Sequence, residues 1–170
     1  RLLDNAEVQL TTVGEPVILL KRIWNGQVCS CIDLRKMSPR VKNCNECYGT
    51  HFNGGYEQYH YSRRSDRRIL ISIDETPEDL LYGEKEGLKQ AFEPNAWTLP
   101  MPSIRDRDLL LRFDLSEKRT FIYEVLTAAR EPIYGRLLGM QKLSLKRLDK
   151  TDIVYTFPID LTTIPDPTGV

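Results

Sequence analysis

Four cysteines, the only ones in this chain of 170 residues, all fall between Cys29 and Cys47. They form two short pairs with the spacing C-x-C-x12-C-x2-C, namely Cys29-Ser30-Cys31 and Cys44-Asn45-Glu46-Cys47. A scaffold held together by disulfides would distribute its cysteines along the chain, because each bridge has to staple a different part of the fold. The clustering indicates one local site instead.

The cysteines lie in a segment, Gln27 to Tyr61, that shows neither helical nor strand periodicity. A loop of about 35 residues is too long to be structureless in a compact domain, so something has to order it. Four thiolates from two tight turns can close a tetrahedron around Zn²⁺. The second turn has a zinc-knuckle form, because Tyr48-Gly49 follows Cys47 and glycine lets backbone amides point at sulfur. We therefore predict a structural zinc ion bound by Cys29, Cys31, Cys44 and Cys47.

Two other states of the cysteines stay open at this point. The thiols can form disulfides, within the chain or to a neighbour, or they can remain buried and free. The first pair, with one intervening residue, is tighter than the usual two-residue spacing of zinc sites. His51 is interpreted as a bystander, since it lies only four residues past Cys47. A closed set of four sulfurs leaves no position for a substrate, so a bound ion would fold the loop rather than catalyse a reaction.

Alternating apolar residues outside the cysteine segment predict an antiparallel sheet. Ile69, Ile71 and Ile73 share one side of their segment, which is the period-2 pattern of a half-buried strand. Similar patterns or a β-rich composition predict the strands Glu15–Trp24, Arg67–Asp74, Asp108–Leu115, Thr120–Thr127, Tyr134–Leu148 and Ile153–Phe157. The expected fold is mainly β: a small antiparallel barrel or sandwich over residues 67 to 158, with the cysteine-rich loop attached.

One short helix is expected after the second of these strands. Thr76 is a suitable N-cap, and Pro77 suits the first helical position. Gly83 and Gly87 each disfavour a helix interior by about 1 kcal/mol, so the helix should end before Gln90.

The predicted elements divide the chain into four parts. Residues 1–26 form an N-terminal segment and strand, and residues 27–62 form the cysteine-rich loop subdomain. Residues 63–158 form a β-rich domain that includes a loop-rich, proline-containing passage around Trp97, and residues 159–170 form an extended C-terminal arm. The arm contains Pro165 and Pro167 and has little apolar periodicity, which is typical of a segment that becomes ordered on a neighbour.

Charge and hydropathy exclude several classes of partner. The chain has 24 Lys and Arg against 24 Asp and Glu, whereas nucleic-acid coats and membrane-surface proteins depend on a strong basic excess. The longest apolar run in its first half, Val17-Ile18-Leu19-Leu20, is far shorter than the roughly 20 residues that cross a bilayer. We therefore expect no membrane partner.

One local basic stretch departs from this balance. Residues 35 to 68 hold eight Lys or Arg against three Asp or Glu. Interleaved aromatic and guanidinium groups can stack on bases and hold phosphates. The candidate contacts to phosphate or to an acidic partner are Tyr59, Tyr61, Arg63, Arg64, Arg67 and Arg68. A solvated rim or a surface for an acidic partner is the favoured interpretation, and nucleic acid is the less favoured one.

The sequence motifs do not support catalysis. The chain has two histidines and lacks the short strings of serine hydrolases, zinc proteases, dinucleotide-binding sites and P-loops. The Cys44-x-x-Cys47 pair lacks the βαβ context of a redox motif. Asp106 and Asp108 flank the start of a predicted strand and are interpreted as turn residues. We predict that the protein is not an enzyme.

Several strings resemble those of one group of proteins. The run from Cys44 to Tyr56, CNECYGTHFNGGY, resembles a C-x-x-C-[YF]-G-T-x-[FY]-x-G-G-Y segment of structural proteins from tailed bacteriophage virions. Further strings similar to that group are Glu93–Leu99, Arg105–Asp108, Tyr123–Val125 and Leu148–Tyr155. The resemblance covers about residues 15 to 158 in order.

This resemblance implies a non-enzymatic subunit of the virion, assembled in the host cytoplasm. The group is similar to neck and head-tail connector components, small β-rich proteins that assemble as rings between portal and tail. The implied partners are further copies of the chain in a ring, together with the portal, adaptor and tail terminator proteins. A tail or baseplate position and a zinc-stabilised nucleic-acid-binding module are the alternatives.

Overall fold

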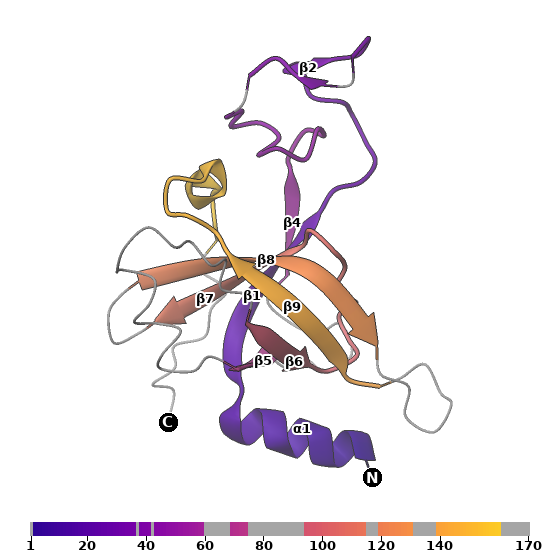
Figure 1. Ribbon diagram of the computed structural model, residues 1–170, viewed down its shortest axis with the longest axis vertical. Coiled ribbons are helices and arrows are strands. Elements are labelled where there is room, and N and C mark those ends of the chain that lie inside the picture. Colours follow the sequence, from indigo (N-terminus) through magenta and orange to yellow (C-terminus); the bar gives the residue numbers. More distant parts are fainter. Residues whose placement is uncertain are drawn as a thin grey trace.

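Six antiparallel strands close into a barrel in the computed structural model, and the cysteine-rich loop projects above it (Figure 1). The structure describes residues 2–36, 38–41, 43–59, 69–74, 94–114, 119–130 and 139–160. The barrel strands are β1 (Glu15–Arg22), β5 (Ile69–Asp74), β6 (Asn95–Thr98), β7 (Leu109–Asp114), β8 (Arg119–Arg130) and β9 (Gln141–Arg147). They pair in the order β1-β5-β6-β9-β8-β7, and the pairing of β7 with β1 closes the ring. The predicted mainly β fold with an antiparallel barrel is confirmed.

Strand β1 is paired along both of its edges. Its first residues, Glu15–Val17, pair with β5, and its last residues, Leu19–Arg22, pair with β4 (Tyr56–Tyr59). Strand β7 pairs along the other edge. The residues from Val17 to Leu20 are buried on both faces, which explains why they form an unbroken apolar run. The sheet therefore includes β1 and β4 and extends beyond the predicted residues 67–158.

The barrel interior is an apolar cluster drawn from all six strands. Its buried members are Val17, Leu19, Ile69, Ile71, Ala96, Ile104, Leu110, Tyr123, Val125, Leu143 and Leu145. The predicted alternation is confirmed where Phe121 packs against the same cluster that contains Tyr123 and Val125. Burying one such side chain stabilises the fold by about 1.5–3 kcal/mol, so the barrel has a driving force of its own.

The residues after β9 cover the outer face of β1, β7 and β8. A short 3₁₀-helix, η1 (Ile153–Thr156), begins at Asp152, whose side chain accepts a hydrogen bond from the amide of Val154. The hydroxyl of Tyr155 accepts a hydrogen bond from the amide of Ile122 on β8. The strand predicted for this segment is wrong, because the aspartate cap turns the chain into a helical turn. The buried residues of this outer cluster are Ile18, Leu20, Tyr56, Leu109, Leu111, Ile122 and Val154.

A helix that the sequence pattern did not predict precedes the barrel. Helix α1 (Leu2–Val13) packs against β5 at the opposite end of the molecule from the cysteine-rich loop (Figure 1). The amide of Gly14 donates to the carbonyl of Leu10 at 2.8 Å, and a Cβ on Gly14 would lie 2.4 Å from that oxygen. Only glycine fits at this helix end. The β-branched residues of the last turn are weak helix formers and concealed the helix.

A buried carboxylate anchors β1 at the point where the cysteine-rich loop begins. Asp108 is 1% exposed and accepts hydrogen bonds from the amides of Arg22 and Arg105, each at 2.9 Å. The ammonium group of Lys21 lies 3.5 Å from the same carboxylate. Asp108 therefore fixes the direction in which β1 enters the loop.

Two further expectations meet different outcomes. The passage around Trp97 contains strand β6, which pairs with β5 and β9, so the prediction of a loop there is wrong for residues 95–98. The helix predicted from Thr76 and residues 161–170 of the predicted arm lie outside the described residues. No helix in the described part of the chain is long and apolar enough to cross a membrane.

Candidate metal centre

The four cysteines meet in the loop between β1 and β4. Their Sγ atoms all lie within 4.8 Å of one another. The Sγ atoms of Cys29 and Cys44 are 3.6 Å apart, and those of Cys31 and Cys47 are 3.4 Å apart. Three of the four side chains are buried, and that of Cys44 is partly exposed. The two sequence pairs thus face each other across one small volume.

These separations fit a metal centre and not disulfides. A Zn–S bond of about 2.3 Å places the sulfurs of a tetrahedron about 3.8 Å apart, whereas a disulfide brings two sulfurs to about 2.05 Å. All four cysteines are free thiols in the structure, so the alternative of disulfides within the chain is not observed. The cluster can hold one metal ion.

Backbone turns position the second pair. The amide of Tyr48 donates to the carbonyl of Cys44 at 2.9 Å, and the amide of Thr50 donates to the carbonyl of Cys47 at 2.8 Å. Tyr48 and Gly49 have positive φ angles of 48° and 79°. Glycine adopts this conformation without steric strain, so Gly49 permits the tight reversal after Cys47. The predicted knuckle form is present.

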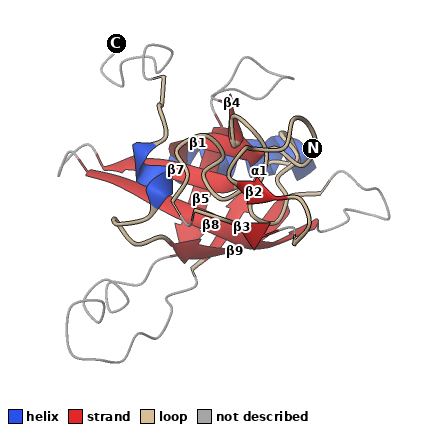
Figure 2. Cartoon of the chain, turned by 90° about the horizontal axis from the view of Figure 1, so that it is seen from above, coloured by secondary structure: helices blue, strands red, loops and turns tan. Residues whose placement is uncertain are grey.

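A second turn positions the first pair. The amide of Ile32 donates to the carbonyl of Cys29 at 3.1 Å, and the amide of Arg40 donates to the carbonyl of Cys31 at 2.8 Å. Between these contacts lies a small hairpin of β2 (Ile32–Asp33) and β3 (Ser38–Pro39). Figure 2, viewed from above, shows this hairpin over the barrel strands. The hairpin brings Arg40 back to Cys31, so the chain continues toward Cys44 and Cys47 from a point next to the first cysteine pair.

Backbone hydrogen bonds join the two pairs. The amide of Cys29 donates to the carbonyl of His51 at 2.9 Å, and the amide of Asn53 donates to the carbonyl of Gln27 at 2.9 Å. Val28 and Phe52 form an isolated antiparallel bridge between these two hydrogen bonds. His51 therefore contributes its backbone, and its side chain is not part of the metal-ligand group formed by the described residues.

Burial and backbone amides shift the pKa values of the thiols in different directions. Burial raises the pKa of Cys29, and burial together with the neighbouring thiols raises the pKa of Cys31. The pKa of Cys44 is lowered to about 7, chiefly because the backbone amide of Glu46 donates to its sulfur. Buried thiols become thiolates when a metal ion supplies the compensating charge. A metal ion bound by the four sulfurs would therefore displace the protons of the buried thiols.

Aromatic side chains connect the loop to the barrel. Tyr48, directly after Cys47, packs edge-on against Phe157 with ring centroids 5.1 Å apart. Tyr56 on β4 also contacts Phe157, at 6.0 Å. On the other side, the guanidinium of Arg22 donates to the carbonyls of Gly49 and Thr50, each at 3.3 Å. The metal centre is thus held against the outer cluster of the barrel.

Of the predicted phosphate contacts, only Tyr59 lies within the described residues. Tyr59 lies half-buried on β4, packs against the interior cluster and donates its hydroxyl to Glu57 at 2.8 Å. Its ring and hydroxyl thus have structural partners. Tyr61, Arg63, Arg64, Arg67 and Arg68 lie outside the described residues, so their role stays a prediction.

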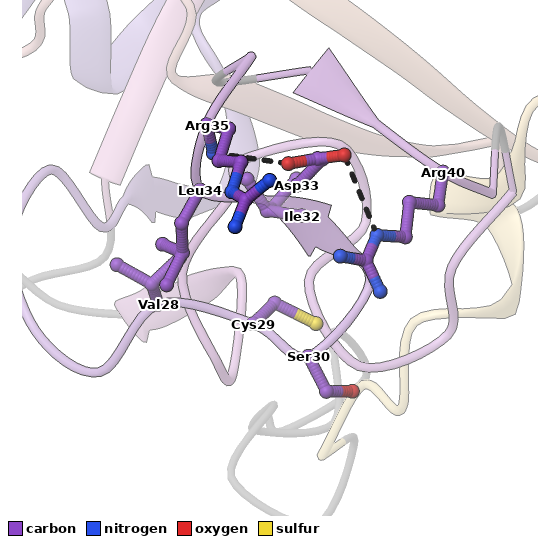
Figure 3. A pocket seen from close by; sticks show the side chains of 8 residues that line it. All are labelled: Val28, Cys29, Ser30, Ile32, Asp33, Leu34, Arg35 and Arg40. Carbon is purple, nitrogen blue, oxygen red and sulfur yellow. Dashed lines mark hydrogen bonds and ion pairs between the residues drawn. The ribbon is translucent and has the colours of Figure 1, made fainter.

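Sequence reasoning missed a pocket beside the cysteines. It has a volume of about 590 Å³, and the side chains around it are shown in Figure 3. The lining residues are Val28, Cys29, Ser30, Ile32, Asp33, Leu34, Arg35 and Arg40. The excess of basic residues from residue 35 onward indicated that Arg35 and Arg40 could belong to a binding surface. That they line one pocket follows from the β2–β3 hairpin, which the sequence did not predict.

Comparisons with known proteins do not identify the chain. No family model and no curated protein matches it. The arrangement itself shows what the site can do chemically: four sulfurs on two turns can hold one ion and link the turns through it.

Proposed function

We propose that the chain is a non-enzymatic structural protein in which a zinc ion orders the loop from Gln27 to Tyr56. The observation that carries this proposal is the convergence of four cysteine sulfurs within 4.8 Å. Thiolate sets of this kind prefer Zn²⁺ among the common divalent ions, and a four-coordinate site filled by protein sulfurs has no position for a substrate. The ion then has a folding role, and the barrel and ordered loop act through contacts with other proteins.

We further propose that these contacts are made in a tailed-phage virion, in a neck or head-tail connector ring between portal and tail. The support is the set of strings that resemble virion structural proteins. Two of these strings contribute to the fold of this chain. CNECYGTHFNGGY contains the second cysteine pair, and residues of Leu148–Tyr155 pack in the outer cluster. A tail or baseplate position remains the alternative within the same class.

The zinc proposal is tested by elemental analysis of the purified full chain. We expect one zinc per chain, with four thiols that become reactive only after chelation. A chain that lacks metal after purification and refolding with zinc, or one that has lost its free thiols, would contradict the proposal.

The position in the particle is tested by immunogold labelling of particles made from the genome that encodes the chain. Label at the neck supports the connector, and label at the tail tip supports the baseplate alternative. If the chain is absent from purified particles, the virion proposal is wrong.

A zinc-stabilised nucleic-acid-binding module is the second candidate. The exposed Arg35, Lys36 and Arg40 on the loop favour it. A salt series on a DNA duplex separates the two functions, because each phosphate contact contributes a slope of about −0.9 to log K against log salt. A slope corresponding to several phosphates favours this candidate, and no binding at moderate salt favours the structural protein.

A further inference from the structure

We propose that the pocket beside the metal centre binds a carboxylate side chain flanked by branched aliphatic residues, presented by a segment of a partner protein. The inference rests on the proposed structural function and names the chemistry of one partner contact. It concerns the face of the loop formed by residues 28–36 and 38–40, which projects above the barrel (Figure 1).

Asp33 contacts both arginines of the pocket. One carboxylate oxygen of Asp33 accepts a hydrogen bond from the backbone amide of Arg35 at 2.9 Å. The other lies 3.9 Å from Nε of Arg40 (Figure 3). The amide of Arg40 donates to the carbonyl of Cys31, so one wall of the pocket is tied directly to the metal-binding cluster. Metal binding and pocket shape are therefore linked.

The two guanidinium groups of the pocket, those of Arg35 and Arg40, offer donors to an anion. Asp33 lines the pocket as well, and the carboxylate of Glu46 lies beside the lining residues Cys29 and Ser30 on the side of the metal centre. Arg40 approaches Asp33 through Nε, which leaves its terminal nitrogens for another acceptor, and no acidic group among the described residues pairs with the guanidinium of Arg35. Guanidinium groups match the planar geometry of a carboxylate and bind it through paired hydrogen bonds.

The apolar lining selects the neighbours of that anion. Val28 is 36% exposed and Leu34 is 68% exposed, and both line the pocket next to the buried Ile32. No aromatic side chain is among the lining residues, so the pocket lacks the aromatic platform on which bases stack in single-strand-binding proteins. A carboxylate with aliphatic neighbours covers both the charged and the apolar part of this surface, which favours a protein segment over nucleic acid.

A competing role for the arginines is compensation of the metal centre. Cys29 lines the same pocket, and four thiolates around a divalent ion carry a net charge of −2. In that role the guanidinium groups would strengthen metal binding and need no external ligand. Metal affinity and ligand affinity therefore have to be measured on the same variants.

The experiment is an NMR titration of the zinc-loaded full chain with the peptide N-acetyl-Leu-Asp-Leu-amide. We expect saturable shifts confined to the amides of residues 28–40, with a Kd on the order of 1 mM, as suits a ligand of this size. The matched peptide N-acetyl-Leu-Asn-Leu-amide should bind about ten-fold more weakly, because it lacks the charge. The double variant Arg35→Gln/Arg40→Gln should lose binding by a similar factor, and Lys36→Gln, outside the pocket lining, should stay within about two-fold of the parent.

Each contrary outcome has a defined meaning. Equal binding of the two peptides, or no shifts in a chain that holds zinc and has an ordered loop, would overturn the pocket proposal and leave the zinc proposal intact. Tighter binding of a twelve-nucleotide oligothymidine to the same amides would assign the pocket to nucleic acid. A double variant that loses zinc while the parent does not discriminate between the peptides would assign the arginines to compensation of the metal centre. A parent chain that binds no zinc at all would contradict the proposed function itself.

Discussion

The barrel and the cysteine-rich loop are ordered by different kinds of interaction. The barrel has an interior of eleven buried residues, ten of them contributed by strands that are far apart in the sequence. The loop has a small cluster in which Ile32 is the one buried residue besides three cysteines, with Cys44 packed against them. Among the described residues between β1 and β4, the regular strands are the two-residue β2 and β3.

This contrast shows how one chain combines two solutions to the same problem. Ordering a residue requires about 1–2 kcal/mol to offset its lost backbone entropy. The barrel supplies this by burying apolar surface, and the loop supplies it through one metal ion held by four side chains. The two regions should therefore respond independently to perturbation, except where Tyr48 packs against Phe157 and where Arg22 donates to the carbonyls of Gly49 and Thr50.

Removal of the metal should produce the largest effect. Chelation, or the substitution Cys44→Ser, should unfold the loop from residue 27 to 56 and leave the barrel folded, because the β-rich residues 67–158 contain no cysteine. Structural zinc contributes about 10–16 kcal/mol of apparent binding free energy in small domains, so loop amides should lose nearly all protection from hydrogen exchange. Hydrogen exchange with mass spectrometry measures both regions at once. Ser30→Ala, next to a ligand, is the matched control, and loss of barrel protection would show that the regions are not independent.

A cavity in the barrel interior should produce the next largest effect. Leu143 is fully buried in that cluster, so Leu143→Ala should lower the free energy of unfolding of the barrel by about 2–5 kcal/mol. Metal affinity should not change while the barrel is folded, because Leu143 does not contact the loop cluster. Denaturant unfolding and a competitive zinc titration measure the two quantities. Lys146→Ala, at an exposed site on the same strand, should stay within about 0.5 kcal/mol of the parent.

The contact between the two regions should couple them by a smaller amount. Phe157→Ala removes the ring that packs against Tyr48, so it should weaken both barrel stability and zinc affinity. A double-mutant cycle with Tyr48→Ala isolates the ring contact, which we expect to contribute about 0.5–1.5 kcal/mol. A coupling energy near zero for zinc affinity would show that the loop holds its ion without support from this ring contact.

The sequence predicted the parts of the molecule in which local pattern and final contacts agree. The period-2 alternation around Ile71 and Tyr123 identified inward-facing residues, and the spacing of the cysteines identified a single cluster. Both follow from short-range geometry. The helix Leu2–Val13 was not predicted, because its last turn is rich in β-branched residues and its stability depends on packing against β5. The same reason applies to β6, whose four residues become a strand only between β5 and β9.

The connection to the barrel could not be predicted, because it depends on long-range contacts. The pocket could not be predicted either, because its lining residues meet only when the short hairpin of β2 and β3 forms. Phe157 meets Tyr48 across more than a hundred residues of sequence, and the segment that carries it was read as a strand. Asp108 is a turn residue as predicted, since its amide donates to the carbonyl of Arg105 at 3.1 Å, but the sequence did not predict that its carboxylate is buried and anchors β1. Alternation shows which face a side chain occupies, and it does not show which distant segment covers that face.

The smallest expected effect concerns the charge nearest to the metal-binding sulfurs. A carboxylate oxygen of Glu46 lies 3.5 Å from the Sγ of Cys29 and 3.3 Å from the hydroxyl of Ser30. In the thiol form Cys29 can donate a hydrogen bond to this carboxylate, but a metal-bound thiolate is a second negative charge and is repelled by it. The carboxylate also helps to raise the pKa of Cys29, after the larger effect of burial.

Glu46→Gln should therefore tighten zinc binding by about two- to five-fold at low salt, an effect limited by the exposure of the side chain. The advantage should shrink as salt is added, because screening acts on exposed charges. A competitive zinc titration at two salt concentrations measures this change, with Ser30→Ala as the control for the lost hydrogen bond. Weaker binding by Glu46→Gln would show instead that the carboxylate supports the metal centre, and the loop would then depend on its surface charges as well as on its four sulfurs.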